Sequence, residues 1–400
     1  MKEALSEERF IHNCLVELCK NTGGRPVGSS NNKEIQDYIG GMFTSFGYNA
    51  EYQSFKCVDW ERGGISLIVG NKKIDADISP YSLPITIKSE FQVVENIDHL
   101  KKVDVNNKVL VLCNELTKEA IMPKNFRFWN PEHHQEIIKT LEDKAPKAII
   151  TVSFSHDKSI PIIEDGDFNI PSAVVPGKFQ DFFKQTTAKE ISLTMNCKRN
   201  PSSGANVIAR LNPGSKHRIV VCAHFDTKPN TPGALDNASG IVTMLLIAKL
   251  LMGSDIKIGV EFVAFNGEDY YSTPGQITYI DKYSHDFKNI NIAINCDGIG
   301  FKKGPTGISP IGCPEELTQI LQQKIIKHES LSMSDPWYQG DHMIFANQGI
   351  PSLAITSQEI FGLIDTVIHT PNDTIDLISI NKIAETALFL EELINTPLSI

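Results

Sequence analysis

The sequence predicts an α/β fold, a mostly parallel mixed sheet flanked by helices on both faces, with a β-rich second domain inserted into it. From Asn206 onward, short apolar runs that suit buried strands alternate with longer runs that suit helices. This alternation is typical of a largely parallel sheet that is covered on both faces. The stretch 57–197 has a different pattern, in which most of the predicted elements are short strands. We therefore expect a discontinuous domain over 1–56 and 198–400 and an inserted domain over 57–197.

Length and charge limit the classes of function. A chain of 400 residues forms two domains or one large one. The 48 acidic residues outnumber the 38 basic ones, which disfavours binding to nucleic acid. The N-terminus has no apolar signal-peptide region, and we expect no membrane-spanning segment. The eight cysteines are diffusely placed and suit free thiols in a reducing cytoplasm. The oligomeric state is not indicated.

The first domain begins with helical spacing of apolar residues over 5–22. A loop of turn-forming residues follows from Gly23, and Ser30 or Asn31 is placed to cap a second helix that ends near Phe46. The alternation over 49–57 predicts a strand.

After Asn206 the expected strands and helices alternate. The strands are Arg218 to Ala223, Ile258 to Phe265, Ile290 to Asn295 and Pro351 to Ile355, and the helices are Ala238 to Leu251, 315–329, 340–348 and 380–395.

The inserted region contains few candidate metal ligands. Its expected elements are strands from Ile65, Val109 and Ala148 and a helix over 132–142. His133, His134 and Glu136 lie in the first turns of that helix. We expect them to face solvent rather than to bind a metal.

Five polar segments follow predicted strands, where periodicity does not explain them. They are His224-Phe225-Asp226, Asp236-Asn237, Glu268-Asp269, Asp297-Gly298 and His369-Thr370-Pro371. Ligands of open α/β sheets gather outside the carboxyl ends of the strands. Two imidazoles and several carboxylates suit a pair of zinc ions, with one carboxylate left to act as a base.

Both histidines have an acidic residue nearby in the sequence. Asp226 is placed to accept the second ring N–H of His224, and Asp373 is placed to support His369 in the same way. A turn histidine beside a turn aspartate is the plainer alternative for the first pair.

The other carboxylates also have two interpretations each. Asp236 precedes an apolar helix and suits either a helix cap or a carboxylate that bridges two metals. Glu268 and Asp269 repel each other unless a cation compensates, so one suits a ligand and the other a general base. A solvated acidic turn is the alternative. Asp297 follows an apolar strand, where a carboxylate is costly unless it is paired or metal-bound.

Taken together, these motifs carry a family resemblance. The order His-x-Asp, Asp-Asn-x-Ser-Gly, Gly-Glu-Asp, Asp-Gly and His-Thr-x-x-Asp resembles the co-catalytic zinc exopeptidases of the aminopeptidase Y and glutamate carboxypeptidase group. The segments that begin at Gly24 and at Asp341 also look like family segments. The resemblance covers about 1–56 and 198–400. The inserted region resembles, more weakly, a protease-associated domain.

The resemblance implies two Zn²⁺ per chain. Carried over by position, His224 and Asp297 hold one ion, Asp269 and His369 hold the other, and Asp236 bridges them. Glu268 is then the general base, and Asp226, which orients the ring of His224, is the second residue expected to be catalytic. A cis peptide bond after Asp236 is also implied.

The expected function is a zinc-dependent metallo-exopeptidase that hydrolyses peptide bonds with a hydroxide shared by two metals. An aminopeptidase acting on short peptides is favoured. The alternatives are a glutaminyl cyclase-like acyltransferase with one zinc, a carboxypeptidase or dipeptidase, and a binding scaffold without activity. A carboxypeptidase needs a cationic clamp, for which Lys228, Lys302 and Lys303 are the nearest candidates in sequence.

One position departs from the family pattern. Many family aminopeptidases have a tyrosine before the last histidine, where it donates a hydrogen bond to the developing oxyanion, whereas this chain has Ile368. Loss of such a donor typically lowers turnover by ~10²–10³. Either zinc alone stabilises the oxyanion, or another residue replaces the tyrosine, for which the candidates are Tyr270, Tyr271, Tyr338 and His342.

Overall fold

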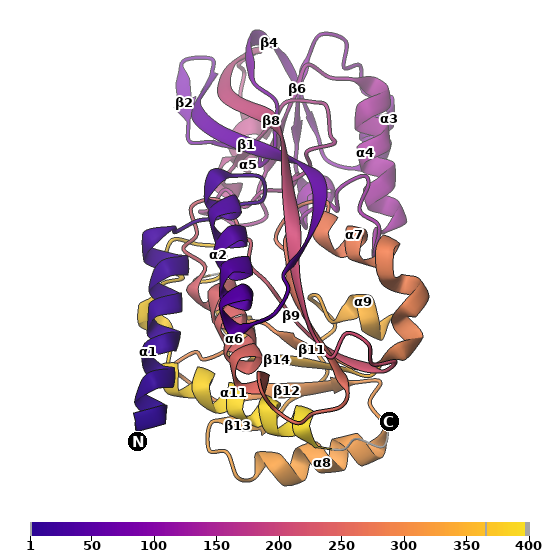
Figure 1. Cartoon of the computed structure of the whole chain (residues 1–400). Helices are drawn as coiled ribbons and strands as arrows, with labels where there is room; N and C mark the ends of the chain where they lie inside the picture. The colour runs from indigo at the N-terminus through magenta and orange to yellow at the C-terminus, as the bar shows by residue number, and fades with distance from the viewer. Residues whose placement is uncertain (1, 365, 397–400) are drawn as a thin grey trace. The chain divides into compact units, whose positions relative to one another are not determined.

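The chain forms two compact units in the computed structural model, which describes residues 2–364 and 366–396. One unit is discontinuous and comprises residues 1–57 and 202–400, and the inserted unit comprises 58–201. The sequence-based domain boundaries lie at 56/57 and 197/198. The strands β1 and β8 carry the chain from one unit to the other (Figure 1).

The discontinuous unit is the predicted α/β fold. Its helices are α1 (Lys2–Val16), α2 (Ser30–Phe46), α6 (Ser239–Leu251), α7 (Pro274–Tyr283), α8 (Glu315–Ile325), α9 (Met343–Ala346), α10 (Ile360–Leu363) and α11 (Ile380–Asn395). Its strands are β9 (Arg218–His224), β10 (Gly259–Phe265), β11 (Ile290–Cys296), β12 (Thr306–Ile311), β13 (Leu331–Met333) and β14 (Ser352–Ser357), with the first part of β1 (Glu51–Val69) and the last part of β8 (Glu190–Leu211).

The sheet of this unit has the order β13-β12-β14-β11-β9-β10-β8. The four strands β14, β11, β9 and β10 are parallel, whereas β12 and β8 run antiparallel to their neighbours β14 and β10. The parallel strands therefore end at the same edge, and that edge carries the polar segments of the sequence.

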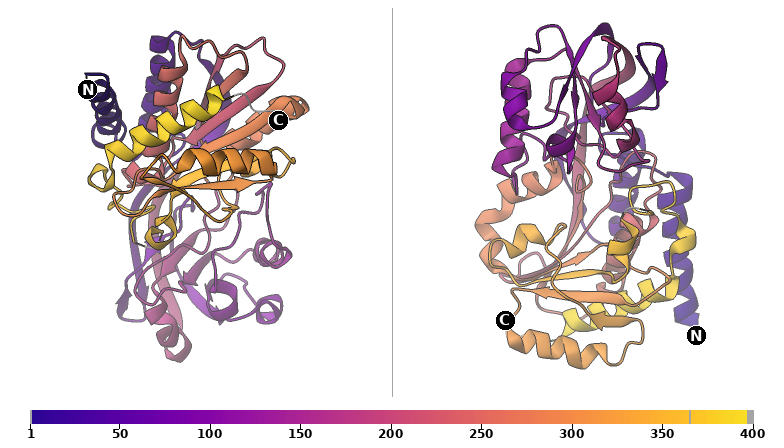
Figure 2. Two further views of the ribbon diagram at one scale, coloured as in Figure 1. Left: turned by 90° about the horizontal axis from the view of Figure 1, so that it is seen from below. Right: turned by 180° about the vertical axis from the view of Figure 1, so that it is seen from behind.

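Helices cover both faces of the sheet because successive strand residues point to opposite sides. On β9, Val221 and Ala223 belong to a core under α1, α2, α6 and α11, whereas Val220 and Cys222 belong to a core under α7 and α9. Figures 1 and 2 show α1, α2, α6 and α11 grouped on one side of the sheet. The segment Ala234–Leu251 is apolar and long enough to cross a membrane, but 89% of it is buried in this core.

The inserted unit has its own parallel strands. Its sheet order is β8-β4-β5-β6-β7-β3, and β1 pairs with β2 and β8. The strands β4, β5, β6 and β7 are parallel to one another, whereas β8 and β3 run antiparallel to β4 and β7. The unit has two apolar clusters. The bounds are β2 (Lys72–Ile74), β3 (Asp77–Ile78), β4 (Ile85–Val94), β5 (Val109–Leu112), β6 (Ala148–Val152), β7 (Ser172–Val175), α3 (Ile97–Lys102), α4 (Glu132–Lys144) and α5 (Gln180–Gln185).

Several element bounds differ from the sequence prediction. The helix expected over 340–348 shrinks to the four residues of α9, and the helix over 315–329 ends at Ile325. The first helix ends as an α-helix at Val16 and continues as a π-helical turn over Glu17–Asn21. The cap of α2 is Ser29, one residue before the predicted Ser30, and its hydroxyl accepts the N–H of Asn32 at 3.1 Å.

Candidate metal centre

The predicted ligands converge at the carboxyl edge of the parallel strands. His224 is the last residue of β9, and Asp297 directly follows β11. Glu268 and Asp269 lie in the loop after β10. Because β9 lies between β10 and β11, these three strand ends are neighbours.

The first group of ligand atoms is built around His224. Its Nε2 lies 3.1 Å from Oδ1 of Asp236 and 3.7 Å from Oδ1 of Asp297. All three residues are buried. One imidazole nitrogen and two carboxylate oxygens within 4.8 Å of one another form a set that a single cation can hold.

The second group is built around His369 and shares a residue with the first. Nε2 of His369 lies 3.0 Å from Oδ2 of Asp236 and 2.9 Å from Oδ1 of Asp269. Asp236 thus directs one oxygen to each histidine, which is the arrangement of a bridging carboxylate. Oδ2 of Asp269 is buried and has no hydrogen-bond partner among the described residues. This donor set fits two zinc ions, with the pairing that the family resemblance implied.

Local backbone structure places Asp236 between the two histidines. The turn Ala234–Ala238 is not regular helix at Asp236, where φ is −119° and ψ is 92°, and the peptide bond Asp236–Asn237 is cis, as the resemblance implied. The alternative that Asp236 caps the helix is wrong, because α6 begins at Ser239. Oδ1 of Asn237 instead accepts the N–H of Gly240 at 2.9 Å, which leaves the Asp236 carboxylate for the site.

The carboxylates strongly favour protonated histidines in the metal-free site. Burial by itself lowers the pKa of His369, but Asp269 and Asp236 raise that pKa to about 11. Burial also opposes protonation of His224, yet Asp226, Asp236 and Asp297 hold its pKa well above the ordinary value. The same contacts hold the pKa of Asp236 below its usual range despite burial.

Zinc binding is therefore expected to release protons near neutral pH. A zinc-bound imidazole nitrogen cannot keep its proton, and both histidines are protonated in the metal-free site because their pKa values are raised. Titration calorimetry in buffers of different ionisation enthalpy should show release of about two protons per chain, and zinc affinity should fall as the pH is lowered. Binding without proton release at pH 7 would contradict these protonation states.

Glu268 is close to both ligand groups but belongs to neither. Its side chain is partly exposed, whereas Asp269 beside it is buried. Removal from water raises the pKa of Glu268 well above its ordinary value, and the carboxylates of Asp269, Asp341 and Asp297 raise it further. A carboxylate that is next to a metal site and is not a ligand suits a proton-transferring group.

Asp226 acts mainly on the loop that carries Glu268. Its Oδ1 accepts the N–H groups of Gly267 and Glu268 at 2.6 and 3.2 Å, and its Oδ2 accepts that of Asp269 at 3.1 Å. The same Oδ1 lies 3.7 Å from Nδ1 of His224, beyond hydrogen-bond distance. The predicted support of the His224 ring is thus an ion-pair contact, and the hydrogen bonds go to the loop.

The predicted support of His369 by Asp373 is wrong. Oδ1 of Asp373 accepts the N–H of Leu235 at 2.7 Å, and Oδ2 accepts the N–H of Asp236 at 3.0 Å. Both oxygens are therefore engaged by the turn that carries the bridging carboxylate. Burial raises the pKa of Asp373 to about 7. Sequence spacing placed this residue near the site but did not show which group it contacts.

The structure excludes one of the four residues that could replace the missing tyrosine as the hydrogen-bond donor to the oxyanion. Ile368 is 5% exposed and belongs to the main apolar core. His342 is buried, and its Nε2 lies 2.7 Å from the carbonyl oxygen of Trp337, so its N–H donates there and not to a substrate. Of the four sequence candidates, Tyr270, Tyr271 and Tyr338 remain.

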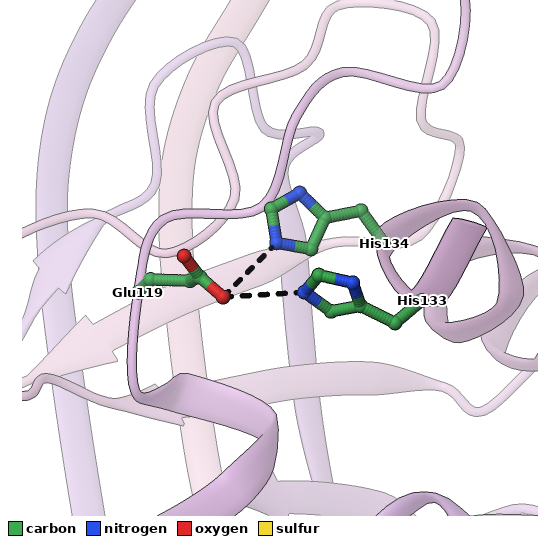
Figure 3. A group of neighbouring side chains, drawn as sticks. All are labelled: Glu119, His133 and His134. Atoms are coloured by element: carbon green, nitrogen blue, oxygen red, sulfur yellow. Dashed lines mark hydrogen bonds and ion pairs between the residues drawn. The ribbon is translucent and has the colours of Figure 1, made fainter. Parts of the chain in front are cut away.

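A third group with metal-binding residue types lies in the inserted unit. Figure 3 shows His133 and His134 directed at one oxygen of Glu119, with Nε2 to Oε1 distances of 3.2 and 3.5 Å. His134 is 2% exposed, so the prediction that it faces solvent is wrong. Its Nδ1 accepts the N–H of Met122 at 3.2 Å, which leaves the ring proton on Nε2. That nitrogen has no free lone pair for a cation. In this group Glu119 has a hydrogen-bond contact with His133 and an ion-pair contact with His134.

The comparison with protein families concerns the region that holds the metal centre. Residues 206–394 match the model of peptidase family M28. The match spans a little under half of the chain. The matched region contains every residue of the two ligand groups and Glu268.

The chain is also similar to individual known proteins. A probable leucine aminopeptidase of Arthroderma benhamiae is 27% identical over 323 residues, which is 76% of this chain and 86% of that protein. Aminopeptidase YwaD of Bacillus subtilis is 28% identical over 268 residues, which is 63% of this chain and 57% of that protein.

Several solved structures have the same fold as this chain. An aminopeptidase from Aneurinibacillus sp. strain AM-1 has a TM-score of 0.76 at 20% identity and covers 96% of this chain and 92% of its own. The zinc aminopeptidase BSAP from Bacillus subtilis has a TM-score of 0.72 at 19% identity, with 96% and 94% covered. A glutaminyl cyclase of Porphyromonas gingivalis has a TM-score of 0.52 at 16% identity, with 98% and 97% covered.

Proposed function

We propose that the chain is a zinc-dependent aminopeptidase that uses two zinc ions to release N-terminal residues from short peptides. The observation that carries this proposal is the division of the Asp236 carboxylate between two histidine-centred groups, with Glu268 beside them. The match of residues 206–394 to the model of peptidase family M28 supports the reaction class. The aminopeptidase names of the relatives support the direction of cleavage.

Each side chain of the site has a distinct task in this reaction. The five ligands would hold the ions, which when bound polarise the substrate carbonyl and acidify water. Glu268 accepts the proton of the attacking water and passes it to the departing amine nitrogen. Because Glu268 belongs to neither ligand group, its carboxylate is available for this transfer. Asp226 holds the N–H groups of the loop and so keeps Glu268 in place beside Asp269.

The charge around Glu268 favours a substrate with a free amino group. Of its charged neighbours, Asp269, Asp297 and Asp341 are acidic, and His224 is the basic one. A carboxylate-rich environment attracts an ammonium group and repels a terminal carboxylate. Of the lysines considered for a carboxypeptidase clamp, Lys302 donates its ammonium hydrogen to the carbonyl of Asp376 at 2.5 Å. This engagement weighs against its use as a clamp.

Two ligand groups rather than one favour the peptidase over a glutaminyl cyclase that uses one zinc. The similarity to the solved cyclase concerns the fold, which both enzyme classes share.

We also propose a protease-associated-like role for the inserted unit and a cytoplasmic location for the protein, with peptides rather than nucleic acids or membranes as partners. The separate apolar clusters of the inserted unit support an independent module. The acidic balance of −10 supports the exclusion of nucleic acid.

The proposed function is tested with matched peptides and a metal count. The zinc-loaded protein should release p-nitroaniline from leucine p-nitroanilide, and the N-acetylated compound should resist cleavage. A chelator should abolish the activity and Zn²⁺ should restore it. Mass spectrometry of peptides should show stepwise loss from the N-terminus. Loss from the C-terminus, or cyclisation of N-terminal glutamine without release of an amino acid, would replace the proposal with one of its alternatives.

A further inference from the structure

The N-terminal segment places a fully buried arginine beneath the metal centre. Nε of Arg25 donates to the carbonyl of Phe225 at 2.5 Å, and its Nη1 and Nη2 donate to the carbonyls of Pro232 and Gly233 at 2.7 and 2.9 Å. The backbone N–H of Arg25 donates to Oγ1 of Thr227 at 3.0 Å. One side chain therefore joins the segment after His224 to the segment that leads into Asp236.

A buried guanidinium is costly unless hydrogen bonds and opposite charges compensate. The side chain of Arg25 is 0% exposed, and the hydrogen bonds of its side chain go to backbone carbonyls. The compensating charges are Asp373, Asp226 and Asp236. These are the bridging carboxylate and the two carboxylates that hold the loops. The charge of Arg25 is thus balanced by the residues that build the site.

A second contact reaches the other half of the site. Nδ2 of Asn32 donates to the carbonyl of Arg25 at 3.1 Å, and the side chains of Asn32 and Asn266 exchange two hydrogen bonds of 2.9 Å. The N–H of Asn266 donates to Oδ1 of Asn206 at 3.0 Å. Asn266 directly precedes the loop 267–269, so this amide chain ends at the residues that carry the base and a ligand.

We propose that Arg25 and Asn32 are positioning residues of the metal centre, which together hold the turn 234–238 and the loop 267–269 at the separation that two metal ions require. The inference rests on the proposed function and extends the site beyond the region 206–394. Neither residue belongs to the two ligand groups. The N-terminal segment acts by organising the two loops before any metal binds.

The test uses the full chain with two substitutions and two matched controls. Arg25→Lys keeps the charge but loses the planar set of donors, and Asn32→Ala removes the amide pair. The control Arg199→Lys alters an arginine of the inserted unit that also donates to backbone carbonyls, those of Tyr81 and Phe168. The control Asn31→Ala alters a neighbouring amide whose hydrogen bonds, to Thr22 and Gly24, stay within the N-terminal segment.

The first readout is hydrogen exchange of the metal-free protein, which requires neither zinc nor turnover. Arg25→Lys should accelerate exchange in peptides that cover 225–238, and Asn32→Ala in those that cover 266–269, by about tenfold. The second readout is zinc affinity, which should fall about 10- to 100-fold in both variants. Both controls should match the parent in these peptides and in affinity.

Parental exchange in both loops of Arg25→Lys and Asn32→Ala would overturn the proposal, whatever the enzyme does. Faster exchange with unchanged zinc affinity would also overturn it, because the two residues would then serve stability alone. If the parent protein bound zinc but cleaved no peptide, the proposed function would fail while the exchange and affinity results would still decide this inference.

Discussion

Glu268→Gln is expected to lower kcat by about 10²–10⁴-fold while both zinc ions remain bound. Glutamine has nearly the same shape but cannot accept the proton of the attacking water. Glu268 belongs to neither ligand group, so the metal content should not change. The measurement is steady-state hydrolysis of an aminoacyl anilide together with zinc quantification by mass spectrometry.

The matched control is Glu316→Gln, an exposed glutamate in the first turn of α8. It should behave as the parent. If Glu268→Gln kept parental turnover, proton transfer would belong to another group. If it lost zinc as well as activity, Glu268 would be a ligand, and the assignment of the two adjacent carboxylates would be reversed.

Asp236→Asn is expected to have the other large effect, and by a different route. Each histidine faces one oxygen of this carboxylate, so the substitution removes a charged ligand oxygen from both groups. Zinc content should fall by roughly half or more, because metal binding depends on deprotonated, charged ligands. We expect kcat/KM to fall at least about 10³-fold, since both ions act on the reaction.

The control for this substitution is Asp255→Asn, an exposed residue in the segment between α6 and β10, which should leave zinc content and turnover unchanged. Circular dichroism should show native secondary structure for both variants. Retention of two zinc ions with parental affinity in Asp236→Asn would contradict the bridging role. Loss of only one ion would restrict Asp236 to a single group.

The sequence predicted the fold class and the cluster of ligands for one physical reason. Parallel strands end at the same edge, so polar residues that directly follow apolar strands, such as His224 and Asp297, come together in space. The end of a buried strand is predicted where a short apolar run stops, and these runs are clear in the sequence of this chain. Elements with weaker patterns were missed: β12 contains Gly307 and Pro310, and α7 begins with Pro274.

The supporting contacts of the site could not be predicted in the same way. Asp373 lies four residues after His369, and this spacing suggested a ring contact, but its oxygens accept backbone N–H groups from Leu235 and Asp236. Because nearly every residue has the same backbone N–H and C=O groups, the sequence does not indicate which of them a side chain will contact. In the sequence, Arg25 lies in a glycine- and proline-rich loop that resembles a family segment, and nothing there indicates its contacts. Its partners are carbonyls about 200 residues away in the chain.

The most direct test of the central claim is the anomalous difference density of a crystal of the zinc-loaded protein, recorded on both sides of the zinc absorption edge. We predict two peaks about 3.5–4 Å apart on either side of the Asp236 carboxylate. One peak should lie against His224 and Asp297, and the other against Asp269 and His369. A single peak, or peaks that leave Asp236 without a metal contact, would contradict the two-zinc site and the mechanism that depends on it.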